Sequence, residues 1–338
     1  MTALSIVVPC FNEEGCLDEL HQRLSAAARS AVGENYELVL VNDGSRDGSW
    51  EAMQRMAADD PHVVAINLSR NHGHQLALTA GLDLCRGDAI LIIDADLQDP
   101  PELLAPMIEA MRESGADVVY GVRRSRAGET AFKRATAHGF YRLLSRATEV
   151  DIPLDAGDFR LMSRRALDAL LAMPEQARFI RGMVAWIGFK QLPFPYDRQQ
   201  RFAGETKYPL SKMMRFALDA MTGFSSAPLK LASHAGLLLS AGSVLLVLYI
   251  AYAWASGRSI QGWTSLMLVV VILGAIQMFA LALMGEYIGR LYNESKRRPL
   301  YIVQDIAGGD GQHARLGYLA DATANSDRPG GKRKRPTR

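Results

Sequence analysis

Short apolar runs alternate with longer stretches of mixed polarity through the first third of the chain. The runs are rich in β-branched residues and occupy residues 4–10, 36–43, 62–70, 89–96 and 116–123. The stretches between them have helical spacing, at about 13–30, 47–58, 74–86 and 100–113. Apolar strands that are separated by helices are typical of a parallel sheet covered on both faces. The pattern therefore predicts a doubly wound α/β domain that binds ligands at the carboxyl ends of its strands.

Two long uncharged runs follow further along the chain. Residues 234–255 and 264–285 contain no Asp, Glu, Lys or Arg, and about 20 apolar residues suffice to cross a bilayer. Lysines and arginines flank the pair on both sides, whereas the short loop between the runs carries only Arg258. The positive-inside rule then places both flanks and both termini in the cytoplasm. We expect a two-helix transmembrane hairpin, and the alternative is a buried helical hairpin in a soluble protein.

These patterns divide the chain into four parts. The expected parts are a cytoplasmic α/β domain at 1–207, an interfacial helix region at 208–231, the transmembrane hairpin at 232–288 and a cytoplasmic C-terminal segment with a disordered basic tail at 289–338. The interfacial region has apolar residues at helical spacing with Lys and Arg between them, which is typical of a helix lying on a membrane. An ordinary core helix is the alternative for that region.

The composition excludes several classes of protein. The 338 residues carry 38 Lys and Arg against 36 Asp and Glu, and nucleic-acid binding requires a stronger basic surplus. Cys10, Cys16 and Cys85 fit no paired framework or metal-binding spacing, so we expect reduced thiols. The glycine patterns of dinucleotide-binding domains and of P-loop NTPases are both missing from the sequence.

Carboxylates stand directly at the end of the fourth apolar run, in LIIDADLQDPPE. Asp94 and Asp96 are two residues apart, so they are predicted to project from the same face of an extended segment. With the amide of Gln98 they offer oxygen ligands that suit a hard divalent cation. The sequence therefore predicts a metal site at this strand end, and the alternative is a pair of acids on a surface turn.

A different role is expected for the last acids of this stretch. Asp99 precedes two prolines, and Glu102 follows it by three residues. This spacing is typical of a helix start in which Asp99 is the N-cap, proline takes the first helical position and Glu102 closes a capping box. We therefore expect a structural role for Asp99.

Polar clusters also follow the first two strands, in PCFNEE and NDGSRDGS. Asp43 is suited to accept a hydrogen bond from the imide of a pyrimidine, and Asn12 and Glu13 are suited to hold a ribose. Each of these is an ordinary turn residue when taken alone. Because they stand at neighbouring strand ends with the DAD acids, they indicate one pocket for a nucleotide and a metal.

Five motifs in order carry a resemblance to a known family. VVPCFNEE, VNDGSRDGS, the DAD of IDADLQDPPE, GDFRLMSRRAL and RFAGETKY resemble those of family 2 glycosyltransferases. More narrowly, the chain looks like the polyisoprenyl-phosphate glycosyltransferases, the group of bactoprenol glucosyltransferases and dolichol-phosphate mannose synthase. The resemblance covers roughly residues 4–304. It implies a GT-A fold, a nucleotide-sugar donor, a Mg²⁺ or Mn²⁺ ion, a polyprenyl phosphate acceptor and a homotetramer.

The resemblance also implies roles for individual residues. The nucleotide-binding residues that it implies are Pro9, Phe11, Glu13 and Asp43. The metal-binding residues that it implies are Asp94, Asp96 and Gln98. The catalytic residues that it implies are Asp158, Asp96 and Arg201. Lys207 is expected to join Arg201 in binding phosphate. His72 and His74 depart from the family pattern: an H-x-H pair can ligate a metal, but a diphosphate contact or a helix-entry role is favoured.

The implied reaction is an inverting transfer of a sugar, with UDP-glucose favoured as donor, onto undecaprenyl phosphate at the cytoplasmic face of the inner membrane. The product would be a lipid-linked monosaccharide for cell-surface glycans. The acceptor is already an oxyanion near neutral pH, so Asp158 is expected to orient it or balance charge. A metal on Asp94 and Asp96, with a cation such as Arg201, would stabilise the departing diphosphate.

Other functions remain open at this point. The same chemistry with UDP-aminoarabinose, UDP-N-acetylhexosamine or GDP-mannose is the alternative to UDP-glucose. A processive polysaccharide synthase would require a QxxRW motif, which the sequence lacks, and a membrane-anchored oxidoreductase would require the missing glycine fingerprint. A non-enzymatic membrane scaffold or transporter subunit is the alternative outside enzymes.

Overall fold

The computed structural model describes residues 2–124, 156–198 and 263–309, together with single positions between 229 and 256. These residues fall into two compact units, one built on a sheet and one that contains a long helix. Three predicted features fall partly or wholly outside the described residues: nearly all of the interfacial region, half of the first span, and the phosphate ligands Arg201 and Lys207.

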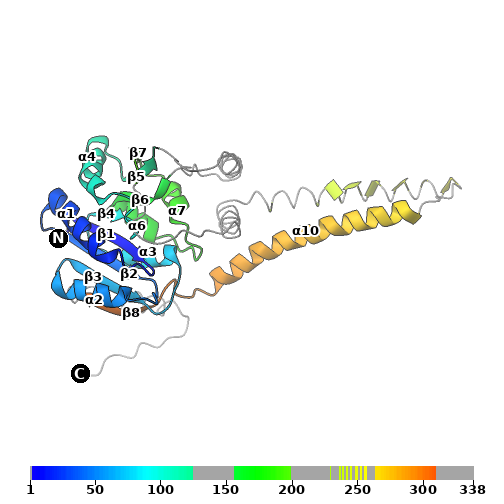
Figure 1. Ribbon diagram of the computed structural model, residues 1–338. Coiled ribbons are helices and arrows are strands. Elements are labelled where there is room, and N and C mark those ends of the chain that lie inside the picture. Colours follow the sequence, from blue (N-terminus) through cyan, green and yellow to red (C-terminus); the bar gives the residue numbers. More distant parts are fainter. Residues whose placement is uncertain are drawn as a thin grey trace, which may run out of the picture. The chain divides into compact units, whose positions relative to one another are not determined.

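The first half of the sheet unit alternates strands and helices, as the hydrophobic pattern predicts (Figure 1). Its elements are β1 (Leu4–Cys10), α1 (Leu17–Val32), β2 (Tyr36–Asn42), α2 (Ser49–Asp59), β3 (Val63–Leu68), α3 (His74–Leu84) and β4 (Ala89–Ile92). The pairs β1–β2, β1–β4 and β2–β3 are all parallel. The predicted parallel, doubly wound arrangement is confirmed for these four strands.

The second half is more irregular. Its elements are η1 (Pro101–Leu103), α4 (Leu104–Ser114), β5 (Val118–Arg123), β6 (Ala156–Ser163), α6 (Arg164–Leu171), α7 (Ile180–Trp186), β7 (Gln191–Tyr196) and β8 (Val303–Gly308). Among the described residues the sheet has the order β7-β5-β6-β4-β1-β2-β3-β8. Because β6 pairs antiparallel with both β4 and β5, and β8 pairs antiparallel with β3, the sheet is mixed and not wholly parallel.

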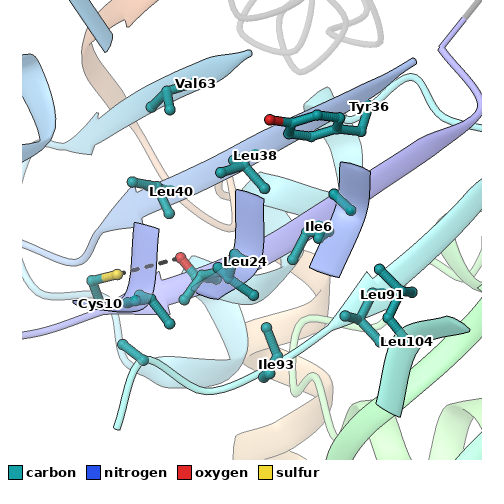
Figure 2. Close-up of a cluster of buried hydrophobic side chains, with 14 of the residues drawn as sticks. Ile6, Cys10, Leu24, Tyr36, Leu38, Leu40, Val63, Leu91, Ile93 and Leu104 are labelled. Carbon is teal, nitrogen blue, oxygen red and sulfur yellow. Dashed lines mark hydrogen bonds between the residues drawn. The ribbon is translucent and has the colours of Figure 1, made fainter. Parts of the chain in front are cut away.

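The core lies between the sheet and the helices that cover it. Every residue of β1, β2 and β3 is buried, because side chains that alternate along a strand meet helices on both faces. Figure 2 shows Ile6 and Leu38 of the sheet near Leu24 of α1, and Leu91 of β4 beside Leu104 of α4. On the other face α3 crosses closely at Gly81, where an added Cβ would lie 2.4 Å from Cγ1 of Val7.

The fourth strand ends earlier than the sequence predicts. β4 stops at Ile92, and the chain then turns through Asp94, Asp96 and Leu97, whose φ is 56°. The two acids therefore lie on a turn and not on an extended segment, so the predicted geometry of alternating side chains was wrong. They still lie just beyond the carboxyl end of β4, where the fold was expected to bind ligands.

The second unit contains α10 (Trp263–Ser295). Within it, Ile272–Ser295 contains an 18-residue window with a mean hydropathy of 1.5, and the segment is long and apolar enough to cross a membrane. At a rise of about 1.5 Å per residue the 33-residue helix is about 50 Å long, more than the ~30 Å hydrocarbon core requires. Its far end carries an ion pair between Arg290 and Glu286, 3.1 Å apart. The second predicted span lies on this helix, and the two-helix hairpin stays a prediction.

Candidate active site

Loops from three strand ends are joined to one another by hydrogen bonds. The backbone N–H of Asn12, after β1, donates to Oγ of Ser45, after β2, over 3.0 Å. The N–H of Arg46 donates back to Oδ1 of Asn12 over 2.8 Å, and the N–H of Glu13 donates to Oγ of Ser49 over 3.0 Å. The predicted ribose ligands thus lie in a shared and well-connected turn, although the Asn12 side chain is already engaged with protein.

Asp43 joins a third loop, the one after β3, to these two turns through hydrogen bonds. Its carboxylate is buried and accepts the backbone N–H groups of His72, at 2.7 Å, and Gly73, at 2.9 Å. Burial raises the pKa of Asp43 despite these two hydrogen bonds, which act in the opposite direction. Its demonstrated role is to organise the loop that leads into α3, and contact with a nucleotide base stays a prediction. Of the other nucleotide-binding candidates, Pro9 is buried within β1 and Phe11 is 44% exposed.

Asp94 has a carboxylate oxygen, Oδ1, that is open to a ligand, and Nε2 of His74 lies 3.6 Å from it. Its Oδ1 atom is buried and accepts no hydrogen bond from any described residue. Burial raises the pKa of Asp94 to about 6; His74 opposes this rise, while Asp158, Asp99 and Asp96 add to it by repulsion. A buried carboxylate oxygen without a donor is costly in free energy unless a cation compensates it. This atom therefore fits a metal ligand.

The other two predicted metal ligands are arranged differently. Asp96 is 6% exposed, and its Oδ1 accepts the backbone N–H of Gln98 over 3.2 Å, which closes the turn. Among the described residues the potential metal-binding group is His74, Asp94 and Asp158, whose ligand atoms all lie within 4.8 Å of one another. The structure thus brings His74 to the site. It separates His74 from His72, which contributes a backbone N–H to Asp43 instead.

Asp158 lies on β6 and is surrounded by donors. It accepts Nε and Nη2 of Arg181, at 2.8 and 3.2 Å, and Nε2 of Gln75, at 3.3 Å. Nε2 of His74 lies 3.1 Å away and must carry the proton, because a carboxylate only accepts. Burial alone would raise the pKa of Asp158, but the hydrogen bonds and charges of His74 and Arg181 hold it far below its ordinary value. Asp158 is therefore a poor proton acceptor.

A second arginine supports the same carboxylate from within the sheet. Arg160 is buried and donates to the backbone oxygens of Asp158 and Gly157, at 3.3 and 3.0 Å. Burial lowers the pKa of Arg160 to about 10, against the attraction of Asp158. Arg160 lies within the motif GDFRLMSR, so the sequence offered a reason to consider it. Arg181 and Gln75 lie in no motif, and the sequence analysis missed both.

The predicted capping box after β4 was wrong. Pro100 takes the N-cap position of η1, and no side chain caps it. Asp99 instead accepts a hydrogen bond from the hydroxyl of Tyr196 on β7, and Nε of Arg198 lies 3.5 Å away. Glu102 forms two hydrogen bonds with Arg23 of α1, each 2.8 Å long. Both acids are therefore engaged by partners from distant elements, which local spacing does not reveal.

Comparison with known proteins places these features in a family. The model for "Glycosyl transferase family 2" matches residues 5–171. An uncharacterized glycosyltransferase of Bacillus subtilis, YkcC, is 50% identical over 305 residues, which cover 90% of this chain and 94% of the relative. The chain belongs to glycosyltransferase family 2. This confirms the family that its five motifs resemble.

The chain is also similar to one further curated protein and to one solved structure. The "Prophage bactoprenol glucosyl transferase homolog" of Escherichia coli is 38% identical over 309 residues, covering 90% of this chain and 99% of the relative. Among solved structures, the mannosyltransferase PcManGT from Pyrobaculum calidifontis, in complex with GDP-Man and Mn²⁺, is 18% identical with a TM-score of 0.42. The match covers 82% of this glycosyltransferase and 86% of that chain.

Proposed function

We propose that this glycosyltransferase transfers a hexose, glucose from UDP-glucose, to a polyprenyl phosphate at a membrane surface. The observation that carries the proposal is the 38% identity to a bactoprenol glucosyl transferase homologue over nearly the whole of both chains. Bactoprenol glucosyl transferases of Shigella phages are similar at 36 to 37% identity. The apolar helix α10 supports a substrate that resides in a membrane.

A divalent ion, Mg²⁺ or Mn²⁺, belongs to this proposal. Asp94 would hold it through the buried Oδ1 atom, which accepts no hydrogen bond from the described residues. Asp96 and Gln98 are the further ligands that the sequence predicts, and His74 is the one that the structure adds. To bind the ion, Nε2 of His74 would give up the proton that it donates to Asp158. The ion would supply positive charge against the diphosphate that leaves during transfer. The carboxylate donors fit both Mn²⁺ and Mg²⁺, which prefer oxygen ligands.

The residues of the chain indicate a reaction without a protein base. The acceptor phosphate, with a second pKa near 6, is already ionised at neutral pH. One of its oxygens forms the new bond to the anomeric carbon while the bond to the nucleoside diphosphate breaks, and attack from the opposite face inverts that carbon. Because Asp158 is held ionised by Arg181 and His74, it would orient groups around the reacting centre rather than remove a proton.

The membrane arrangement is also part of the proposal. We place the catalytic domain at 1–207, an interfacial region at 208–231, a hairpin at 232–288, and both termini in the cytoplasm, with four copies of the chain in the assembly. Arg201 and Lys207 of RFAGETKY would bind phosphate. Reporter fusions at the N-terminus and after Arg338 should behave as cytosolic and a tag near Ser259 as external; an external C-terminus would contradict the hairpin.

The reaction itself has a direct test. Detergent-solubilised protein is incubated with undecaprenyl phosphate, Mn²⁺ and one nucleotide sugar at a time, and the lipid product is weighed by mass spectrometry. We expect a hexosyl lipid from UDP-glucose, little product in excess EDTA, and a loss of about a hundredfold or more in Asp96→Asn with the fold intact. If only another nucleotide sugar serves as donor, the assignment of glucose is wrong. Full activity in EDTA would contradict the assignment of a metal ion. A folded protein that transfers no sugar would favour a membrane scaffold.

A further inference from the structure

Three polar side chains lie next to one another on the adjacent strands β2, β3 and β8 (Figure 1). Asn42 is the strand partner of Asn67, and Asn67 is the strand partner of Asp305. The two asparagines are 2% and 8% exposed, whereas Asp305 is exposed. Asparagine is uncommon in strands, and a buried amide is normally hydrogen-bonded. Two neighbouring buried amides near the carboxyl end of the sheet therefore require an explanation.

A chain of hydrogen bonds joins these side chains to the turn after β2. Nδ2 of Asn67 donates to Oδ2 of Asp305 over 3.3 Å, and Nδ2 of Asn42 donates to Oδ1 of Asn67 over 2.8 Å. Oδ1 of Asn42 then accepts the backbone N–H of Ser45 over 3.2 Å. The Oγ atom of Ser45 accepts the N–H of Asn12 in turn. The chain thus connects the edge strand β8 with the turns after β2 and β1.

The carboxylate of Asp305 sets the direction of this chain. A carboxylate only accepts hydrogen bonds, so Asn67 turns its NH₂ group toward Asp305 and its oxygen toward Asn42. Asn42 must then donate to Asn67, which leaves its oxygen for the N–H of Ser45. If one or both amides were reversed, two donors or two acceptors would face each other at one of the contacts. An exposed charge at the sheet edge therefore orients a buried acceptor beside the turn.

The turns held by this chain carry two of the residues that are predicted to bind the nucleotide. Asn12, a predicted ribose ligand, has a φ of 57°, an uncommon conformation that its surroundings must stabilise. Asp43, the predicted ligand of the base, directly follows Asn42 in the sequence. The geometry of both residues thus depends on whether Asn42 and Ser45 keep their hydrogen bonds.

We propose that Asp305, Asn67 and Asn42 are positioning residues for the nucleotide part of the donor. They hold Ser45, and through it Asn12, in the conformation that binds the nucleoside diphosphate. The inference rests on the proposed function, since that function brings a nucleotide to these turns. It adds a residue of the segment after α10, which contains none of the five family motifs, to those that set the affinity for the donor.

Reversing the direction of the chain tests this inference. Asp305→Lys replaces an acceptor by a donor at an exposed position, so both amides would have to reverse and Asn42 would present its NH₂ group to the N–H of Ser45. The control is Gln304→Lys, which places the same charged side chain on the neighbouring exposed residue of β8. Asp305→Glu keeps the carboxylate and is the conservative variant. The full-length protein in detergent is titrated with UDP in Mn²⁺, with GDP as the second probe.

We expect Asp305→Lys to weaken UDP binding about fivefold or more, the effect of one neutral hydrogen bond. The sign decides the cause, because an added positive charge would by itself favour an anionic nucleotide. Gln304→Lys should therefore bind UDP at least as tightly as the wild type, and Asp305→Glu should stay within about twofold of it. In the transfer assay the loss should appear in KM for the donor, with kcat nearly unchanged.

A second substitution should restore the direction of the chain. Asn67→Asp, added to Asp305→Lys, moves the carboxylate to β3, where it pairs with the introduced lysine and accepts from Nδ2 of Asn42. The oxygen of Asn42 then returns to the N–H of Ser45. We expect UDP affinity to recover to within about twofold of the wild type, which a double-mutant cycle over the two positions would measure.

Several results would overturn the inference. Unchanged UDP binding in Asp305→Lys contradicts it, whatever happens to the free energy of unfolding. An equal loss in Gln304→Lys would indicate a general disturbance of β8, and a double variant that binds no better than Asp305→Lys would show that the direction of the amides does not matter. Wild-type protein that binds neither UDP nor GDP would overturn both the inference and the donor. If the wild type binds UDP but transfers no sugar, and the variants behave as expected, the proposed function fails while the inference stands.

Discussion

Asp94 and Asp158 belong to the two halves of the sheet and differ in how their charge is compensated. Asp94 follows β4 in the parallel half and keeps a buried oxygen that accepts no hydrogen bond from the described residues. Asp158, on β6 of the mixed half, accepts from Arg181, Gln75 and His74. The first carboxylate has a looser pairing, with Nε2 of His74 3.6 Å from its Oδ1, whereas the second bonds directly to Arg181 and His74.

The pKa values of the two groups move in opposite directions, although burial acts on both in the same direction. Burial acts on both, and without a close donor it raises the pKa of Asp94 to about 6. At Asp158 burial is outweighed by hydrogen bonds and charges from His74 and Arg181, and the pKa falls far below its ordinary value. Burial alone therefore does not decide the chemistry of an acid; its donors do.

Removing the compensated carboxylate should have the largest effect on stability. Asp158→Ala leaves Arg160 and Arg181 without their shared partner, and breaking such a buried pair costs about 3–5 kcal/mol of the free energy of unfolding. Urea unfolding followed by circular dichroism would measure it. Asp168→Ala is the control, since Asp168 is 64% exposed and lies 3.9 Å from Arg164. Equal loss in the two variants would show that the pairing of Asp158 contributes nothing.

A smaller loss of stability is expected when the neutral hydroxyl that donates to the buried Asp99 is removed. Tyr196→Phe removes the hydroxyl that donates to Asp99, which is 1% exposed. Leaving a buried acceptor without this donor should cost about 1–3 kcal/mol. Asp99→Asn keeps an accepting oxygen and should cost less in the same unfolding assay. If Tyr196→Phe is neutral, Arg198 satisfies Asp99 unaided.

Replacing Asp94 should not lower the free energy of unfolding of the metal-free protein, in contrast to replacing Asp158. Asp94→Asn removes a buried charge without a donor, so the metal-free protein should be unchanged or up to about 1 kcal/mol more stable. Mn²⁺ at about 100 times its dissociation constant should add about 2.7 kcal/mol to the wild type and nothing to the variant. Thermal unfolding with and without Mn²⁺ measures both. Destabilisation of the metal-free variant would mean that Asp94 has a partner of its own.

The smallest effect is expected at the exposed pair of Glu102 and Arg23. The hydrogen bond from Arg23 lowers the pKa of Glu102, so the pair stabilises the fold above pH about 4.5, and this contribution disappears as the pH falls through the lowered pKa. Because Glu102 is 56% exposed, Glu102→Gln should cost below about 1 kcal/mol at pH 7. Unfolding curves of both proteins at pH 7 and pH 3 should differ less at pH 3 than at pH 7.

Sequence patterns revealed the parallel half of the sheet and only part of the mixed half. β1 to β4 are apolar runs separated by helices, and that regularity is visible locally. The pairing of β6 between β4 and β5, and of β8 with β3, depends on distant segments. The same holds within the site: Asp94 and Asp158 stand in motifs, but Gln75 lies 83 residues from Asp158 and has no pattern of its own.

Asp99 shows why local rules failed here. Its spacing to Pro100 and Glu102 matches a helix cap, yet Tyr196, 97 residues away, supplies the hydrogen bond that engages it. Glu102 is similarly engaged by Arg23, 79 residues distant. A buried carboxylate is normally hydrogen-bonded, and here the donor comes from another strand or helix. Local spacing therefore predicts only the hydrogen bonds that a residue can form with its neighbours in the sequence.

The late strand β8 has a consequence for how the chain is made. It completes the edge of the sheet at β3, with Asn67 and Asp305, 238 residues apart, joined at 3.3 Å. At about 5–20 residues per second, β3 leaves the ribosome some tens of seconds before its neighbour exists. An unpaired edge recruits strands from other molecules. Early release of the nascent chain after α10 would therefore yield a protein with its reacting groups in place and a strong tendency to aggregate.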